Sequence, residues 1–262
     1  MNDGNSAAER IRALMTASPG LAEKDQETLF LTGNEYISLP EIGTGGEIKS
    51  VNLLHMGARG LLEFRGAAEH PLLVPFVAID GAAALRAESC RWSYHRDWMP
   101  RFKLERAGRY AVEGEIFAPP GHRGCCYRLR LANLSGAPLK AAAGWQGCWG
   151  GFNYLVFSRR SVRGEHTVKY DPWTGSLLLE ASSGLPLASL ALSLVSGREE
   201  EMLHHWDLSS SPGEKDLISY RGAATLNLVP GAVTTVTLYL AANLEADGAG
   251  TTAVDLKRRG AR

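Results

Sequence analysis

Two glutamates in one short segment have the residue type and spacing that acid–base chemistry requires. Glu113 and Glu115 fall two positions apart in Tyr110–Phe117, a segment with strand-like alternation. Residues two apart on a strand project from the same face, which puts the two Cβ atoms about 7 Å apart. Glycosidases use a carboxylate pair, but they need a substrate cleft between the two groups and one raised pKa. Neighbours on one strand face usually share a solvated environment, so the sequence favours a solvated pair and predicts no catalytic residue.

A stretch of aromatic and charged residues, Cys90–Phe102, has weak periodicity and is read as a loop. The side chains that could do chemistry there are Trp92, Tyr94, His95, Asp97 and Trp98. Aromatic faces stack on sugar rings and carboxylates bind hydroxyl groups, so the loop is predicted to contact a carbohydrate or a neighbouring domain. The alternative is that these side chains pack inside the fold, where most large aromatic residues lie. His95 as acid, with Glu113 or Glu115 as base, would suit a sugar isomerase.

A second aromatic cluster, Gly144–Tyr154, places Trp145 and Trp149 among four glycines. Glycines let backbone and rings approach a partner closely, which suits a carbohydrate or interdomain contact. The same composition is typical of a bent strand whose glycines make room for buried rings. The sequence leaves both interpretations open.

The sequence contains no recognisable motif for a metal, a cofactor or a catalytic nucleophile. His204 and His205 are adjacent, so in a strand they point to opposite sides of the sheet. Cys125 and Cys126 belong to no zinc spacing and are predicted to be reduced packing residues. Gly43–Gly46 lacks the Lys-Ser/Thr of a phosphate loop, and no Gly-x-Ser-x-Gly elbow occurs. We therefore predict no metal, no cofactor and no serine hydrolase.

The elements that must position these residues are mostly strands. From residue 28 the apolar period is two, most clearly at Val236, Leu238 and Leu240, while Pro, Gly and Asn mark reversals between the runs. Helical periodicity occurs only near the ends, at residues 6–17 and 243–262. The pattern predicts an all-β fold: a large antiparallel two-sheet sandwich with short terminal helices.

Composition excludes several classes of protein. Lys plus Arg and Asp plus Glu both number 28 among the 262 residues, which disfavours a nucleic-acid partner. The longest apolar runs are too short for a membrane span, and the first residues lack the basic and apolar regions of a secretory signal. Four cysteines make no disulfide framework. A cytoplasmic protein without membrane segments is expected.

Three segments together resemble the N-terminal β domain of amylo-α-1,6-glucosidase-like, glycogen-debranching-type glycoside hydrolases: Val112–Gly124, Tyr127–Gly136 and Thr251–Gly260. In that family a supersandwich of the galactose-mutarotase type precedes an (α/α)6 barrel that carries the catalytic carboxylates. The resemblance implies a β-supersandwich at 28–242 and, at 243–262, the start of a linker helix towards a barrel outside this chain. The helical periodicity at residues 6–17 separately predicts a helical arm at residues 1–27. The resemblance covers the sandwich and linker only, so no catalytic residue is carried over.

The function implied by this resemblance is that of a non-catalytic β domain of a carbohydrate-active enzyme acting on α-glucan-type oligosaccharides. Its expected partners are carbohydrate and the C-terminal (α/α)6 catalytic domain of the same parent protein, and a homodimer is left open. Two alternatives also stay open. One is a stand-alone mutarotase-like sugar isomerase. The other is a glycan-binding module with Trp92, Trp98 and Trp149 as its platform.

Overall fold

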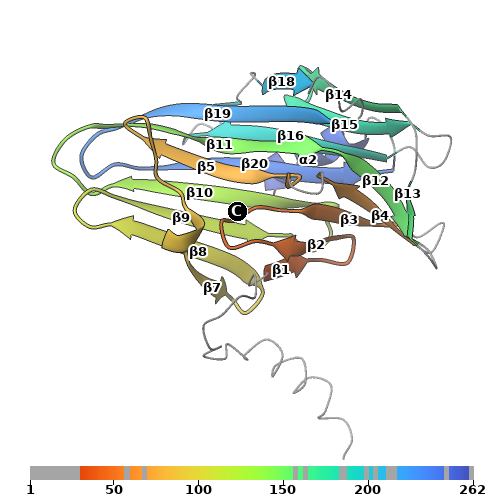
Figure 1. Ribbon diagram of the computed structural model, residues 1–262, viewed down its shortest axis with the longest axis horizontal. Helices are drawn as coiled ribbons and strands as arrows, with labels where there is room; N and C mark the ends of the chain where they lie inside the picture. The colour runs from red at the N-terminus through yellow and green to blue at the C-terminus, as the bar shows by residue number, and fades with distance from the viewer. Residues whose placement is uncertain are drawn as a thin grey trace, which may run out of the picture.

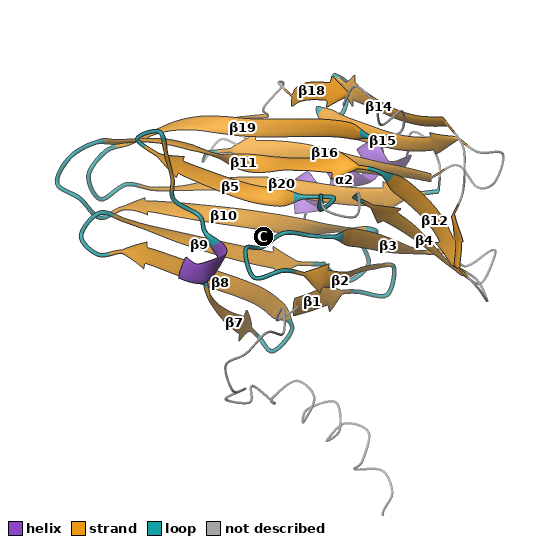
Figure 2. Cartoon of the chain, in the orientation of Figure 1, coloured by secondary structure: helices purple, strands orange, loops and turns teal. Residues whose placement is uncertain are grey.

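The protein is built almost entirely from antiparallel strands (Figures 1 and 2). The computed structural model describes residues 30–55, 60–66, 70–155, 159–161, 165–182, 188–197, 201–202, 206–210, 217–244 and 248–259. The predicted arm at residues 1–27 and the His204–His205 pair lie outside these ranges. The all-β prediction is therefore confirmed over the part of the chain that is described.

The largest sheet has nine strands and contains segments from the middle and the end of the chain. Across the sheet the order is β14 (Glu165–Asp171), β15 (Ser176–Ser182), β16 (Ala188–Ser196), β20 (Val233–Asn243), β10 (Gly124–Asn133), β9 (Tyr110–Phe117), β8 (Met99–Arg106) and β7 (Arg91–His95), with β17 (Glu201–Met202) paired to β16. Strand β20 thus lies between β16 and β10 and joins two halves of the sheet.

Two smaller sheets complete the fold. The five-stranded sheet has the order β18 (Trp206–Ser210), β19 (Ile218–Leu228), β11 (Leu139–Trp149), β5 (Val74–Ile79) and β6 (Ala82–Ala83). The six-stranded sheet has the order β1 (Phe30–Gly33), β2 (Ile37–Ile42), β3 (Ser50–His55), β4 (Gly60–Arg65), β12 (Gly151–Leu155) and β13 (Arg159–Ser161). Both sheets pack against the nine-stranded sheet, so the predicted two-layer sandwich has one layer divided into two hydrogen-bonded sheets (Figure 1).

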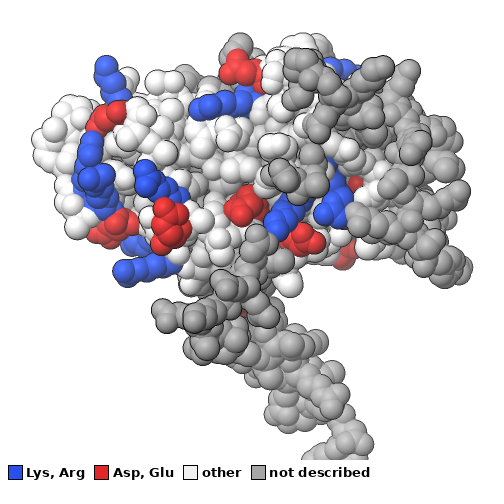
Figure 3. Space-filling model, in the orientation of Figure 1, with Lys and Arg blue, Asp and Glu red and all other residues white. Residues whose placement is uncertain are grey.

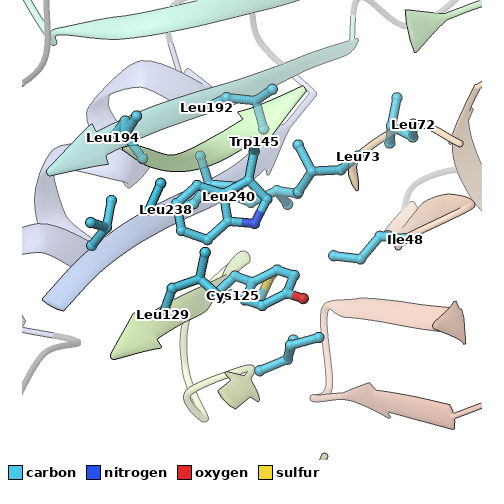
Figure 4. Packing of buried hydrophobic residues seen from close by; sticks show 14 of the residues in the cluster. Ile48, Leu72, Leu73, Cys125, Leu129, Trp145, Leu192, Leu194, Leu238 and Leu240 are labelled. Atoms are coloured by element: carbon cyan, nitrogen blue, oxygen red, sulfur yellow. The ribbon is translucent and has the colours of Figure 1, made fainter. Parts of the chain in front are cut away.

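One continuous core fills the space between the layers. Leu129 and Leu238 of the nine-stranded sheet, Trp145 of the five-stranded sheet and Leu53 of the six-stranded sheet all belong to it. Trp145 lies at its centre, with Leu238 and Leu240 beside the indole (Figure 4). The alternating apolar residues of β10 and β20 point inward as the sequence predicts, because successive residues of a strand face opposite sides.

The helical elements among the described residues are short: a 3₁₀ turn η2 (Ala87–Ser89) and helix α2 (Gly248–Arg259). Helix α2 packs on the outer face of the nine-stranded sheet, where Ala249, Ala253 and Leu256 form a second small core with Tyr239 and Ala241 of β20. These helical positions are four and three residues apart and so line one face. Neither helix among the described residues is long and apolar enough to cross a bilayer.

Candidate functional site

Glu113 and Glu115 lie on the outer face of the nine-stranded sheet, on the opposite side of β9 from the core residues Val112 and Ile116. Neighbouring strands supply a basic partner to each. Arg101 Nη2 donates to Glu113 Oε2 at 2.7 Å. Arg128 Nη1 lies 3.7 Å from Glu115 Oε2. The two glutamates therefore share a face, as predicted, but they belong to a ladder of ion pairs rather than to a cleft.

The electrostatics of Glu113 do not suit a general acid. Partial burial alone would raise its pKa, but the hydrogen bonds and charges of Arg101 and Lys103 outweigh this effect and lower the pKa. Lys103 Nζ lies 3.4 Å from Glu113 Oε1. A carboxylic acid that donates a proton near neutral pH needs the opposite shift.

His95 does not join either glutamate. It ends β7 at the edge of the sheet, where it pairs with Met99 of β8. Strand β8 separates it from β9, and adjacent strands are about 4.8 Å apart. Among the described residues, no hydrogen bond or ion pair links His95 to Glu113 or Glu115.

The aromatic stretch Cys90–Phe102, expected to be a loop, is instead the β7–β8 hairpin. This expectation was wrong because the weak periodicity hides a tight reversal, in which Arg96 and Asp97 adopt left-handed φ angles of 52° and 65°. Trp92 stacks on Phe30, with ring centroids 4.2 Å apart, and its Nε1 donates to the Thr44 carbonyl at 2.8 Å.

The remaining side chains of the hairpin divide by exposure. Tyr94 is 41% exposed and Asp97 is exposed at the tip, whereas Trp98 is half-buried and its carbonyl accepts a hydrogen bond from Thr32 Oγ1 at 3.2 Å. Of the predicted contact residues in this hairpin, Tyr94 and Asp97 are therefore the two that offer exposed surface to a ligand. Trp92 acts chiefly as a packing residue.

Trp145 and Trp149 leave no surface for a sugar, which corrects the contact interpretation of the second aromatic cluster. Trp145 is fully buried, and Trp149 is buried against Phe64 at a centroid distance of 6.2 Å. Gly144 is needed because strands lie close together here: a Cβ on Gly144 would lie 2.0 Å from the Gly222 carbonyl oxygen. The cluster is therefore a core strand whose glycines make room for buried rings, which was the second of the two interpretations that the sequence left open.

A pocket of about 460 Å³ lies over the five-stranded sheet, where β5, β11, β18 and β19 run side by side. Gln146, Arg221 and Asp207 are consecutive neighbours in the register across β11, β19 and β18, and all three are exposed. The Arg221 guanidinium lies over the Phe76 ring at 4.2 Å from its centroid. His70 also lines this pocket.

This pocket combines an amide, a guanidinium, a carboxylate and an imidazole within one concave surface. Arg donates to hydroxyl oxygens, a carboxylate accepts from hydroxyl groups, and an amide does both. Such a set suits a small polyhydroxylated ligand. Sequence reasoning missed these residues because they come from four separate segments, and no local motif joins them.

Comparison with known proteins assigns a fold rather than a sequence family. No protein-family model and no curated protein matches the sequence significantly. A proposed aldose 1-epimerase from Escherichia coli K12 superposes with a TM-score of 0.54 at 12% identity, over 83% of this chain and 99% of that chain. A galactose mutarotase-like protein from Lactobacillus casei ATCC 334 gives a TM-score of 0.51 at 10% identity, over 82% of this chain and 100% of that chain. The chain has the galactose mutarotase-like fold.

The galactose mutarotase-like fold also occurs within a longer protein. A proposed kojibiose phosphorylase from the human microbiome superposes with a TM-score of 0.52 at 9% identity, over 90% of this chain. The present chain spans 33% of that protein. The supersandwich prediction is thereby confirmed.

The described part of this galactose mutarotase-like fold contains no group of three or more His, Cys, Asp or Glu residues that could hold a metal ion. Cys125 and Cys126 are buried and not joined in a disulfide, as predicted for packing residues. Burial raises the pKa of the Cys126 thiol to about 12, although the charge of Arg128 opposes the shift. Acidic and basic side chains are interspersed on the face seen in Figure 3, without a large patch of one sign.

Proposed function

We propose that this chain is a non-catalytic β domain of a carbohydrate-active enzyme that acts on α-glucan-type oligosaccharides. The observation that carries the proposal is the pocket over the five-stranded sheet, where Gln146, Asp207 and Arg221 stand side by side. In this proposal the pocket binds sugar hydroxyl groups. The parent enzyme would be of the amylo-α-1,6-glucosidase-like type, with an (α/α)6 barrel as partner.

Two findings support a binding role rather than a catalytic one. Glu113 and Glu115, the carboxylates whose spacing suggested hydrolysis, are engaged by Arg101 and Arg128. The fold also forms about one third of the length of a proposed kojibiose phosphorylase, so it is compatible with a role as one domain among several.

Isothermal titration with maltotriose tests the proposal. The wild-type chain should bind it saturably without releasing glucose. Arg221→Ala and Gln146→Ala should each weaken binding by about tenfold, the effect of losing roughly 1.4 kcal/mol of interaction. Arg130→Ala is the matched control, because Arg130 is an exposed arginine of the glutamate ladder on another sheet. An affinity unchanged in both pocket variants, or hydrolysis by the isolated chain, would contradict the proposal.

A stand-alone sugar isomerase is the second candidate, and one observation favours it. His70 and Asp207, an imidazole and a carboxylate, line the same pocket and could serve as acid and base for anomer interconversion. Polarimetry with freshly dissolved α-glucose and α-galactose should then show faster mutarotation than buffer. His70→Ala should abolish this acceleration, while His95→Ala should leave it intact. A rate equal to that of buffer would eliminate this candidate.

A further inference from the structure

The turn between β14 and β15 exposes a tryptophan far from the pocket described above. Trp173 is 93% exposed, and the next most exposed large apolar side chain among the described residues, Leu31, is 64% exposed. Large aromatic rings are mostly covered in folded proteins, so a nearly free indole calls for an explanation.

The backbone that carries this ring is firmly held. Asp171 accepts hydrogen bonds from the Trp173 amide at 3.1 Å, the Thr174 amide at 3.3 Å and Thr174 Oγ1 at 2.6 Å. From the other side, Lys257 Nζ of α2 donates to the Thr174 carbonyl at 2.8 Å and to Ser193 Oγ at 3.1 Å. The turn is therefore fixed before any ligand arrives, which reduces the entropy lost on binding.

Helix α2 approaches this turn closely because Gly250 has no side chain. A Cβ at that position would lie 3.0 Å from two atoms of the Thr174 side chain. The close approach makes one wall of a hollow of about 520 Å³ beside the indole. The other lining residues are Lys169, Tyr170, Leu178 and Thr251, together with the turn itself.

The hollow offers one apolar face and several polar groups. The hydroxyl group of Thr251, which is exposed on α2, can both donate and accept hydrogen bonds. The Tyr170 ring instead packs against the main core on the inner face of β14. The ammonium of Lys169 lies 2.9 Å from Glu180 Oε2, so its charge is already balanced and does not call for an anionic ligand. An indole bordered by a hydroxyl group matches a neutral sugar ring, which has an apolar face and a polar edge.

We propose that Trp173 and the hollow beside α2 form a second carbohydrate site, in which a neutral sugar ring stacks on the indole and its hydroxyl groups bind Thr251. The site shares no residue with the pocket over the five-stranded sheet. Docking of another protein domain is less favoured, because Trp173 is the only strongly exposed large apolar side chain described on this turn, and protein interfaces bury a broader apolar patch.

Titration of tryptophan fluorescence with maltotriose and cellotriose tests this site. It is performed on a background that carries both Arg221→Ala and Gln146→Ala, so that binding at the first pocket is weakened more than by either substitution alone. At least one trisaccharide should change the emission saturably, in the millimolar range typical of weak ligands. Trp173→Ala should abolish the saturable change and the matching heat in isothermal titration. Trp173→Tyr should retain part of the binding, because a phenol ring still stacks.

The outcomes separate this inference from the proposed function. Loss of binding in Trp173→Ala, with an unchanged unfolding midpoint, supports the second site even if Arg221 proves irrelevant to sugar binding. Unchanged affinity in Trp173→Ala, or no saturable response to either trisaccharide, overturns the second site and leaves the first pocket to its own test. Loss of sugar binding in Thr251→Val but not in Trp173→Ala would likewise overturn the stacking role.

Discussion

The ion pairs around Glu113 have a consequence at acidic pH that belongs to this single residue. Its folded-state pKa is lower than the ordinary value of 4.5. The ionised side chain therefore stabilises the fold above pH 4.5, and this contribution is lost as the pH falls through the lowered folded-state pKa. We expect Glu113→Gln to lower the free energy of unfolding at about pH 7 and to have a smaller effect at about pH 3.

Urea unfolding of the wild type and the variant at both pH values measures this difference. Glu105→Gln is the control, because Glu105 is exposed on the neighbouring strand β8 and makes none of the ion pairs described for Glu113. An equal loss of stability at both pH values would show that the ionised carboxylate is not responsible.

Replacing a tryptophan by alanine should have very different effects on stability at positions 145 and 173. Trp145→Ala removes a fully buried ring and should cost about 3–5 kcal/mol of unfolding free energy, because a cavity remains among Leu192, Leu238 and Leu240. Trp173→Ala removes an exposed ring and should change stability by less than about 0.5 kcal/mol. Guanidinium unfolding monitored by circular dichroism compares them, and similar losses would contradict the assigned burial.

The difference in burial between these two tryptophans could be predicted in part from the sequence. Trp173 lies in Asp171-Pro-Trp-Thr-Gly175, a turn motif, and turns lie at the surface, so its exposure was accessible to prediction. Trp145 lies among glycines, where a bent core strand and a ligand contact have the same composition. The pocket formed by Gln146, Asp207 and Arg221 was not predictable, since its residues meet only through the pairing of distant strands.

Among the elements, helix α2 should contribute strongly to stability because it covers the second core. Leu256 is fully buried and lies 2.4 Å from the position that a Cβ on Gly124 would take, so helix and sheet are tightly packed. Leu256→Ala should cost about 2–5 kcal/mol. Arg259→Ala is the control, since Arg259 is exposed and only pairs with Asp255 at 2.9 Å. Thermal unfolding with little difference between the two variants would refute this role.

Elements with a strong local pattern were predicted well, and those without one were not. The alternation in β10, β16 and β20 and the helix near the C-terminus emerged from the sequence because each is encoded by a local period. The β7–β8 hairpin was missed because its aromatic residues obscure the alternation. The predicted arm at 1–27, the domain boundaries, the homodimer and the cytoplasmic location stay predictions.

On the scale of the whole molecule, the position of β20 determines which truncations fold. This strand pairs along its length with β10 on one side and β16 on the other. A chain ending at Leu228 loses β20 and α2, which opens two strand edges and the core between them. A chain ending at Leu244 keeps every described strand and loses helix α2.

We therefore expect the shorter chain to aggregate or to lack cooperative unfolding, and the longer one to unfold cooperatively at a lower midpoint than the full chain. Circular dichroism during thermal unfolding and size-exclusion chromatography distinguish these outcomes. A folded, monomeric chain ending at Leu228 would show that the nine-stranded sheet does not need its inserted strand.

The same strand order bears on how the protein is made. As the ribosome releases the polypeptide from its N-terminal end, β10 and β16 emerge long before their shared partner, and their backbone groups stay available to unwanted neighbours for that interval. Completion of the largest sheet must wait until Asn243 has left the exit tunnel. The edges of β10 and β16 that β20 will occupy therefore stay unpaired until synthesis is nearly finished.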